Sequence, residues 1–410
     1  MKVAIATFGC KLNQYETQLM IEQLKQNGYE IANMNEKVDL YIINSCAVTS
    51  KASKESRMLA KKLSRVGTVI YTGCDSYLEE NLKDKVILVG NNFKNNIMDV
   101  LSGKRASTEK QTKFYPIDKT VFTFSEKSRA LVKIQEGCNN HCTYCIIPFL
   151  RGRERDKDES LVLEEIKRLV DTGFPEVVIT GTNIGSYRRF KDLLKKISKI
   201  NGIFRVRISS IEPMYVDEEL IDIVSDLNFA KHLHIPMQSG SDRILKLMGR
   251  GYTKAKFEKI VEYCHKKGIF VGTDVIVGFF GEGEKEFRET YSFIEILPLS
   301  FGHVFSYSKR PMTPASRIEM DLPRGPIVRE RNRALRELFD RKRGESIRSL
   351  MGREVELVVE TTKVKTKRGE FFKAISSEYV KVLVKDIKKG LVKCKIVDCN
   401  NNYGYGEWPK

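Results

Sequence analysis

Three apolar, β-rich runs in the first hundred residues each end at or close to a cysteine, and this repeat constrains the fold more than any other feature. The cysteines are Cys10, Cys46 and Cys74, and segments with helical periodicity, residues 16–26 and 53–63, separate the runs. Strand–helix–strand units of this length are typical of a parallel sheet covered by helices on both faces. Because the carboxyl ends of parallel strands meet at one edge, where ligands bind, we expect the three cysteines to lie together there.

Each of these cysteines alone would be read as a small buried hydrophobic residue. Their equivalent positions in three successive units favour a metal or cluster site instead, with zinc as the alternative to an iron–sulfur cluster.

A second group, Cys138, Cys142 and Cys145, lies in the segment GCNNHCTYC. Thiolates coordinate zinc and iron–sulfur clusters, and four ligands normally complete either site. No fourth ligand is obvious, because Cys264 lies in an apolar helical pattern and His141 sits between two of the cysteines. The spacing would also suit one face of a buried helix, but the Asn-Asn pair and the proline just beyond favour a loop. Three thiolates on a four-iron cluster leave one iron open to a small chelating ligand.

The chain divides into segments with different patterns, and the fold class they predict is α/β. Residues 1–108 predict a doubly wound parallel sheet, and a polar, basic stretch over 102–127 looks like an interdomain linker. Residues 124–343 predict a partial (βα)6 barrel, and residues 344–410 a small antiparallel β-barrel. The strands expected in the central barrel are Ala130–Ile134, Glu176–Ile179, Arg205–Ile208, His232–Ile235, Val271–Val277 and Gly302–Phe305.

The net charge of +18 favours a polyanionic partner. Nucleic acid is favoured over a membrane surface, because no amphipathic anchor and no apolar run of about 20 residues is evident. The amino terminus lacks the pattern of a signal peptide, so we expect a cytoplasmic location. Nine cysteines in such a reducing compartment do not predict disulfides.

The segment from Gly137 to Pro148, GCNNHCTYCIIP, resembles the cluster loop of radical S-adenosylmethionine (SAM) enzymes. Over essentially the whole chain, the sequence is similar to the methylthiotransferase family of these enzymes, which ends in an RNA-binding TRAM domain. Within that family, GCKLNQYE at residues 9–16, TGTNIGSY at 180–187 and SSIEP at 209–213 are similar to the branch acting on N6-threonylcarbamoyladenosine in tRNA. Branches that modify isopentenyladenosine in tRNA, or an aspartate of a ribosomal protein, usually carry Asp-Ser where this chain has Glu-Thr.

The resemblance implies two [4Fe–4S] clusters, one held by each cysteine group, and S-adenosyl-L-methionine as a further cofactor. It implies radical cleavage of SAM at the Cys138 cluster, sulfur insertion from the Cys10 cluster, and a methyl group from a second SAM. It also implies tRNA as partner, a cytosolic electron donor such as flavodoxin or ferredoxin, a monomer, and no membrane. The residues that match SAM-contacting positions are Tyr144, Thr182, Glu212, Gln238 and Asp274.

Some features leave the interpretation open. Phe280 stands where the family commonly has proline, and Met312 where glycine is more usual. The basic run at residues 151–155 would suit either a phosphate contact or a solvated helix start. Basic residues next to Phe371 and Phe372 suggest an RNA-binding hairpin or an exposed hairpin over a core pair. A rival from another class is a zinc-stabilised RNA-binding protein without catalysis.

Overall fold

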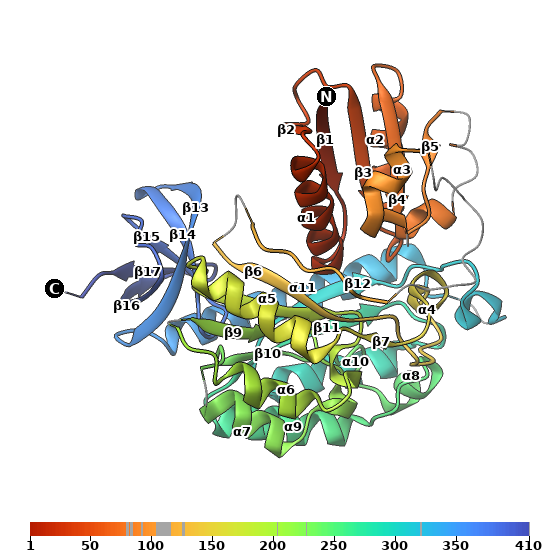
Figure 1. Cartoon of the computed structure of the whole chain (residues 1–410). Coiled ribbons are helices and arrows are strands. Elements are labelled where there is room, and N and C mark those ends of the chain that lie inside the picture. The colour runs from red at the N-terminus through yellow and green to blue at the C-terminus, as the bar shows by residue number, and fades with distance from the viewer. Residues whose placement is uncertain are drawn as a thin grey trace.

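The computed structural model describes residues 1–78, 82, 85–91, 93–103, 116–124, 128–202, 204–226, 228–319 and 322–409. These residues form an amino-terminal α/β unit, a central open barrel and a small closed barrel, arranged around a common junction (Figure 1). Most of the linker expected over 102–127 lies outside the described residues.

The amino-terminal unit is a parallel five-stranded sheet in the order β2-β1-β3-β4-β5. One face packs apolar residues such as Ile42 against Met20 and Leu24 of α1, and the other face packs against Ala60 and Leu63 of α2. The doubly wound parallel sheet expected from the sequence is therefore confirmed. Its elements are β1 (Lys2–Thr7), α1 (Lys11–Gln26), β2 (Glu30–Ala32), β3 (Leu40–Ser45), α2 (Ser50–Leu63), β4 (Thr68–Gly73), β5 (Ile87–Leu88) and α3 (Ile97–Leu101).

The central unit has two short sheets, β7-β6-β8-β9 and β10-β11-β12, in which every pair except β6–β7 is parallel. A bridge between Val206 and Phe229, and a hydrogen bond from the Ile211 amide to the His234 carbonyl (2.9 Å), join the sheets into an open barrel. The six expected strands are confirmed. The strands are β6 (Ala130–Glu136), β7 (Arg155–Asp156), β8 (Glu176–Gly181), β9 (Arg205–Ile208), β10 (His232–His234), β11 (Phe270–Val277) and β12 (Leu299–Ser306).

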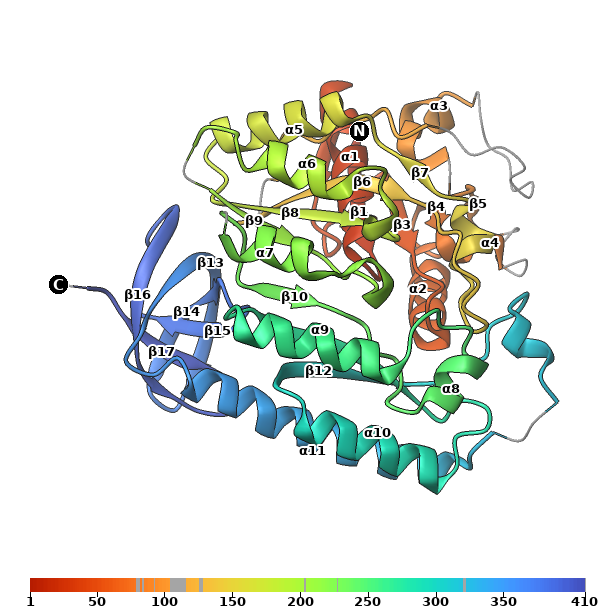
Figure 2. The ribbon, with the colours of Figure 1, turned by 90° about the horizontal axis from the view of Figure 1, so that it is seen from below.

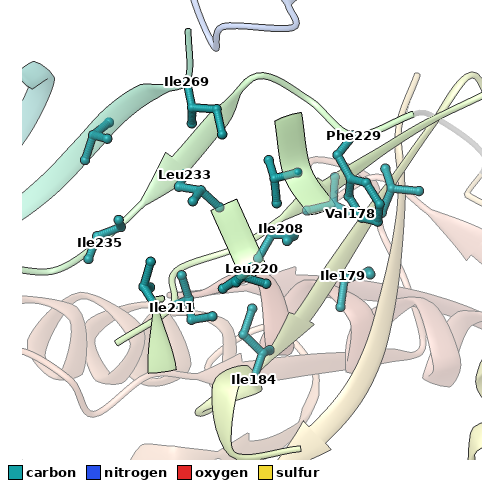
Figure 3. Close-up of a cluster of buried hydrophobic side chains, with 14 of the residues drawn as sticks. Val178, Ile179, Ile184, Ile208, Ile211, Leu220, Phe229, Leu233, Ile235 and Ile269 are labelled. Atoms are coloured by element: carbon teal, nitrogen blue, oxygen red, sulfur yellow. The ribbon is translucent and has the colours of Figure 1, made fainter. Parts of the chain in front are cut away.

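Helices cover the outside of the barrel strands (Figure 2). Side chains such as Ile179, Ile208, Leu220 and Leu233 fill the space between the strands and these helices (Figure 3). No helix in the described part, 24-residue α11 included, is apolar enough over a sufficient length to cross a bilayer. The helices are α4 (Ile147–Arg151), α5 (Glu159–Asp171), α6 (Phe190–Ile197), α7 (Glu218–Asp226), α8 (Asp242–Leu247), α9 (Lys254–Lys266), α10 (Glu284–Ile296) and α11 (Gly325–Arg348).

The carboxyl-terminal unit is a closed barrel in the order β13-β14-β15-β17-β16. Four of its strand pairs are antiparallel, as expected, but β15 and β17 pair in parallel, which the alternating pattern did not indicate. The expected basic hairpin is formed by β13 and β14. The strands are β13 (Glu354–Thr366), β14 (Gly369–Ser376), β15 (Lys381–Val384), β16 (Leu391–Cys399) and β17 (Gly404–Glu407).

Candidate active site

The three amino-terminal cysteines lie at the carboxyl edge of the parallel sheet, as strand polarity predicts. Cys46 and Cys74 directly follow β3 and β4, and Cys10 is the residue before the first turn of α1. Gly9 has a φ of +93°, and a Cβ on it would lie 2.5 Å from the Cys46 Sγ. A side chain at that position would therefore displace Cys46, and glycine lets the β1–α1 turn approach it closely.

Cys138, Cys142 and Cys145 lie in the loop between β6 and α4, not on a helix. The Thr143 amide donates to the Met248 carbonyl at 2.9 Å, and the Cys145 amide to the Cys142 carbonyl at 3.0 Å. These bonds hold the loop in a fixed shape on the barrel edge.

Both cysteine sets suit an iron–sulfur cluster. Burial raises the pKa of Cys46 and Cys145 to about 12 and that of Cys138 to about 11, so a bound cation is needed to hold these thiolates at neutral pH. Within the described residues, no three His, Cys, Asp or Glu side chains converge on a position for a single metal ion.

Arg250 is a site residue that the sequence did not single out. Its Nη1 lies 3.1 Å from the Cys142 Sγ and 3.3 Å from the Tyr144 Oη, and its Nη2 pairs with Glu212. Burial raises the pKa of Glu212, and Arg250 acts against that rise. The guanidinium thus joins a cysteine of the cluster loop to two of the residues matched to SAM contacts. Arg250 is one of 71 basic residues, so only its burial in the fold distinguishes it.

Three of the five matched SAM residues, Tyr144, Gln238 and Asp274, line one cavity of about 230 Å³. Thr49, three residues after Cys46, lines it as well. Gln238 has a φ of +65°, and its amide donates to the Asp274 carbonyl at 2.8 Å. A non-glycine residue held in the left-handed region is a form of strain that concentrates at functional sites.

A larger neighbouring cavity of about 480 Å³ is lined by Cys10, Thr182, Asp274 and His234 among others. His234 Nε2 lies 3.0 Å from Asp274 Oδ1, and the Thr182 hydroxyl accepts the Gly137 amide at 3.2 Å. Asp274 therefore borders both cavities, and of the five matched residues Glu212 lines neither.

An apolar cluster joins the surroundings of the two cysteine sets across the junction. Cys74 belongs to one apolar cluster with Ile146 and Leu150, which follow Cys145 in the chain. Apolar packing therefore joins the segment that follows Cys145 to the end of β4.

A fully buried ion network also crosses this junction. Arg151 of the cluster-loop side donates to Glu16 of α1 at 3.0 and 3.2 Å and to Glu136 at 2.8 Å. Lys94 and Lys133 lie 2.6 and 3.4 Å from the Glu16 carboxylate. The interpretation of the basic run as a phosphate contact or a solvated helix start is wrong for Arg151, because it is 1% exposed and ion-paired.

Aromatic rings form one wall of the larger cavity. His232 stacks on Tyr379 of the carboxyl-terminal unit, with ring centroids 4.6 Å apart and planes 20° apart. Tyr379 has a φ of +67°, and the Arg207 guanidinium lies 5.1 Å from its ring. Burial and Arg207 lower the pKa of His232 well below its ordinary value, so the imidazole is neutral. No pattern in the sequence indicated that a loop residue of the small barrel would reach this cavity.

The structure shows the surroundings of Phe280 and Met312, the two residues that depart from the family pattern. Phe280 is buried and packs edge-on against Phe279 and Tyr307, with centroids 5.7 and 5.4 Å apart. Met312 has a φ of +66°, which is the backbone that glycine adopts without strain.

The open parallel barrel with a three-cysteine loop after its first strand defines the radical SAM class. Residues 132–294 match the Radical SAM superfamily model, and residues 2–89 match Uncharacterized protein family UPF0004. The chain is 38% identical to the threonylcarbamoyladenosine tRNA methylthiotransferase MtaB of Aquifex aeolicus over 89% of this chain and 95% of the relative. It is 35% identical to the protein of the same name from Bacillus subtilis, over 99% and 96%. The chain belongs to the methylthiotransferase family of radical SAM enzymes.

Solved structures share the fold. The radical SAM methyltransferase TsrM of Kitasatospora setae superposes with a TM-score of 0.60 at 15% identity, over 77% of this chain and 76% of that one. The cobalamin-dependent SAM radical enzyme OxsB gives a TM-score of 0.52 at 12% identity, over 77% and 54%.

Proposed function

We propose that this protein inserts a methylthio group at C2 of N6-threonylcarbamoyladenosine at position 37 of tRNA, beside the anticodon. The observation that carries the proposal is the shared cavity: Cys10 of the amino-terminal set and Asp274 of the matched SAM residues line the same space of about 480 Å³. Relatives named for this reaction, at 35–38% identity over most of the chain, support the substrate.

Cys138, Cys142 and Cys145 would hold one [4Fe–4S] cluster, and Tyr144 and Asp274 would contact SAM beside it. Bound together, these cofactors supply the one-electron chemistry that removes hydrogen from an unactivated ring carbon, which no side chain achieves at neutral pH. The protein's own contribution is positioning. Arg250 donates to the sulfur of Cys142 and offsets the negative charge of the thiolates.

Cys10, Cys46 and Cys74 would hold a second [4Fe–4S] cluster, from which sulfur is delivered. Burial raises the pKa of Cys74, and Arg151 and Lys94 act against that rise. The same cations that hold the junction together thus favour the thiolate that a cluster requires.

The carboxyl-terminal barrel, which the family resemblance identifies as a TRAM domain, would bind RNA. Its β13–β14 hairpin carries Lys363, Lys365 and Lys367, and Lys363 Nζ lies 5.4 Å from the ring centre of Phe372. Basic groups beside aromatic rings supply phosphate affinity and stacking faces. We further propose that the protein is a monomer, that it works in the cytoplasm, and that flavodoxin or ferredoxin is its electron donor.

The test is nucleoside mass spectrometry after incubating anaerobically reconstituted protein with SAM, a reductant and tRNA that carries threonylcarbamoyladenosine at position 37. We expect the 2-methylthio product together with deoxyadenosine. Parallel reactions with isopentenyladenosine tRNA and with ribosomal protein test the alternative substrates. Zinc without iron or sulfide after anaerobic purification would favour the non-catalytic RNA-binding protein and refute the proposal.

A further inference from the structure

Lys11 is a cation beside the amino-terminal cysteine set. It follows Cys10 directly, begins α1, and lines both the 480 Å³ cavity and an adjoining one of about 340 Å³. Its side chain is partly buried and forms no hydrogen bond or close ion pair with any residue that the structure describes, although Glu176 and Cys10 lie near enough to attract its charge. A charged amine held this way costs free energy unless an anion compensates it.

The carboxylates around Lys11 are already paired with arginines. Glu176 is already shared by Arg205 (2.7 Å), Arg207 (2.8 Å) and Arg129 (3.6 Å). Arg129 also pairs with Glu360 at 3.0 Å.

Lys11 and the three arginines of this basic group thus outnumber the two carboxylates of Glu176 and Glu360. The remaining acid of the larger cavity, Asp274, is paired with His234.

An anion that enters the larger cavity would therefore bind at the Lys11 end. We propose that Lys11 binds the carboxylate of the threonylcarbamoyl group on the substrate adenosine and so selects this nucleoside. The inference rests on the proposed function, and it assigns substrate selectivity to one side chain.

The chemistry of the base suits this placement. N6 and C2 both lie on the adenine edge that carries N1. Binding of the N6 substituent by Lys11, next to Cys10, would therefore also bring C2 toward the cysteine set that would deliver sulfur. The stacked pair of His232 and Tyr379 in the same cavity offers a flat face for the base. An isopentenyl substituent has no charge to compensate Lys11, so the same site disfavours it.

Binding of anticodon stem-loops to the full-length protein, measured by fluorescence anisotropy, tests the inference without requiring turnover. The stem-loops carry threonylcarbamoyladenosine, its neutral carboxamide analogue, or unmodified adenosine at position 37. Lys11→Met should weaken binding of the first about 10- to 100-fold, the range for a hydrogen bond to a charged group, and leave the other two unchanged. Lys11→Arg should retain most of the affinity. Lys25→Met, at the exposed far end of the same helix, is the matched control and should change nothing.

The carboxamide stem-loop closes a double-mutant cycle. Wild-type protein should bind the carboxamide stem-loop more weakly than the native one, by the same factor by which Lys11→Met weakens binding of the native stem-loop. Lys11→Met should bind the carboxamide stem-loop no more weakly than it binds the native one. An equal loss for all three stem-loops would place Lys11 on a backbone phosphate and overturn the inference. Unchanged binding of the native nucleoside by Lys11→Met, with a normal melting temperature, would overturn it as well.

The proposed function is judged separately, by the methylthio product of the wild-type enzyme. If that product forms while Lys11→Met binds normally, the inference fails and the function stands. If wild-type protein neither prefers nor modifies threonylcarbamoyladenosine, both fail.

Discussion

Replacing Glu16 by glutamine should destabilise the junction between the amino-terminal sheet and the central barrel. The Glu16 carboxylate is fully buried and lies 2.6 Å from Lys94 Nζ and 3.0 Å from Arg151 Nη1. Glutamine keeps the size of the side chain but removes its charge. Among the described residues, Lys94 would then face only neutral oxygens, those of the new amide and of the Asn44 side chain at 3.4 Å, and its charge would lose its nearest carboxylate.

Breaking a buried ion pair by removing one partner costs about 3–5 kcal/mol, because the other charge stays buried without compensation. At about 2–4 °C per kcal/mol for a unit of this size, the melting midpoint of the junction should fall by about 6–20 °C. Glu30→Gln is the matched control: its pair with Lys2 at 3.1 Å is solvent-exposed, and exposed pairs contribute little.

The effect should depend on pH in a definite direction. Burial alone would raise the pKa of Glu16, but Arg151, Lys94 and Lys133 outweigh it and hold the pKa well below its ordinary value of 4.5. The folded state therefore keeps Glu16 charged at a pH where the unfolded chain protonates it. The stability that this supplies is complete above pH 4.5 and declines as the pH falls below it, so the gap between wild type and Glu16→Gln should narrow there.

Thermal unfolding followed by circular dichroism, with hydrogen exchange of α1 and β6 to localise the loss, measures both effects. Adding Lys94→Met to Glu16→Gln should recover part of the stability, since the double variant removes the stranded charge. A midpoint for Glu16→Gln equal to that of the Glu30→Gln control, or a gap that is constant between about pH 3 and pH 7, would refute the reasoning.

Four other changes test the site. Cys142→Ala should abolish SAM cleavage yet keep the amino-terminal cluster, whereas Cys46→Ala should spare cleavage but stop sulfur insertion. Deoxyadenosine, bound iron and the methylthio nucleoside are measured for both variants. Full methylthiolation by Cys46→Ala would contradict the assignment of the two cysteine sets. Arg250→Met removes a donor to the Cys142 sulfur and should make the reduction potential of that cluster more negative in a spectroscopic titration; an unchanged potential would count against this role. Gly137→Ala should lower the iron content of the protein, because at a φ of +81° the added Cβ would lie 2.0 Å from a backbone oxygen. Gly28→Ala is the control and should leave the iron content unchanged, because Gly28 has a φ of +80° but no atom within 4 Å of the added Cβ. Equal iron contents of the two variants would show that the loop adapts.

Much of the fold could be predicted because parallel strands that are buried on both faces appear in the sequence as short, nearly continuous runs of apolar residues. The edge position of Cys46 follows from strand polarity, which any strand–helix–strand unit shares. The parallel pairing of β15 with β17 could not be predicted, since alternation shows that Gly404–Glu407 is a strand but not which neighbour it joins. That choice depends on the path of the whole chain around the barrel.

The site was predictable where the residue type itself is informative. Cysteines that recur at equivalent strand ends or at close spacing in a loop point to metal chemistry, so Cys10 and Cys138 are conspicuous in the sequence. Lysine and arginine are not informative in this way, because 71 of them are spread along the chain and most are solvated. Lys11, Arg151 and Arg250 gain significance only when the fold removes them from water and fixes what lies beside them.

The buried charges at the junction are better explained by alignment than by stability. Apolar residues of equal volume would hold the two units together at least as strongly, since desolvation offsets most of the gain from a buried pair. An apolar interface tolerates sliding, however, whereas the hydrogen bonds from Arg151 to Glu16 and to Glu136 fix direction as well as distance. In the proposed reaction both cysteine sets act on one substrate, and a misplacement of about 1 Å can cost on the order of 100-fold in rate. Loss of the network should therefore reduce sulfur insertion more than SAM cleavage, which needs one side of the junction alone.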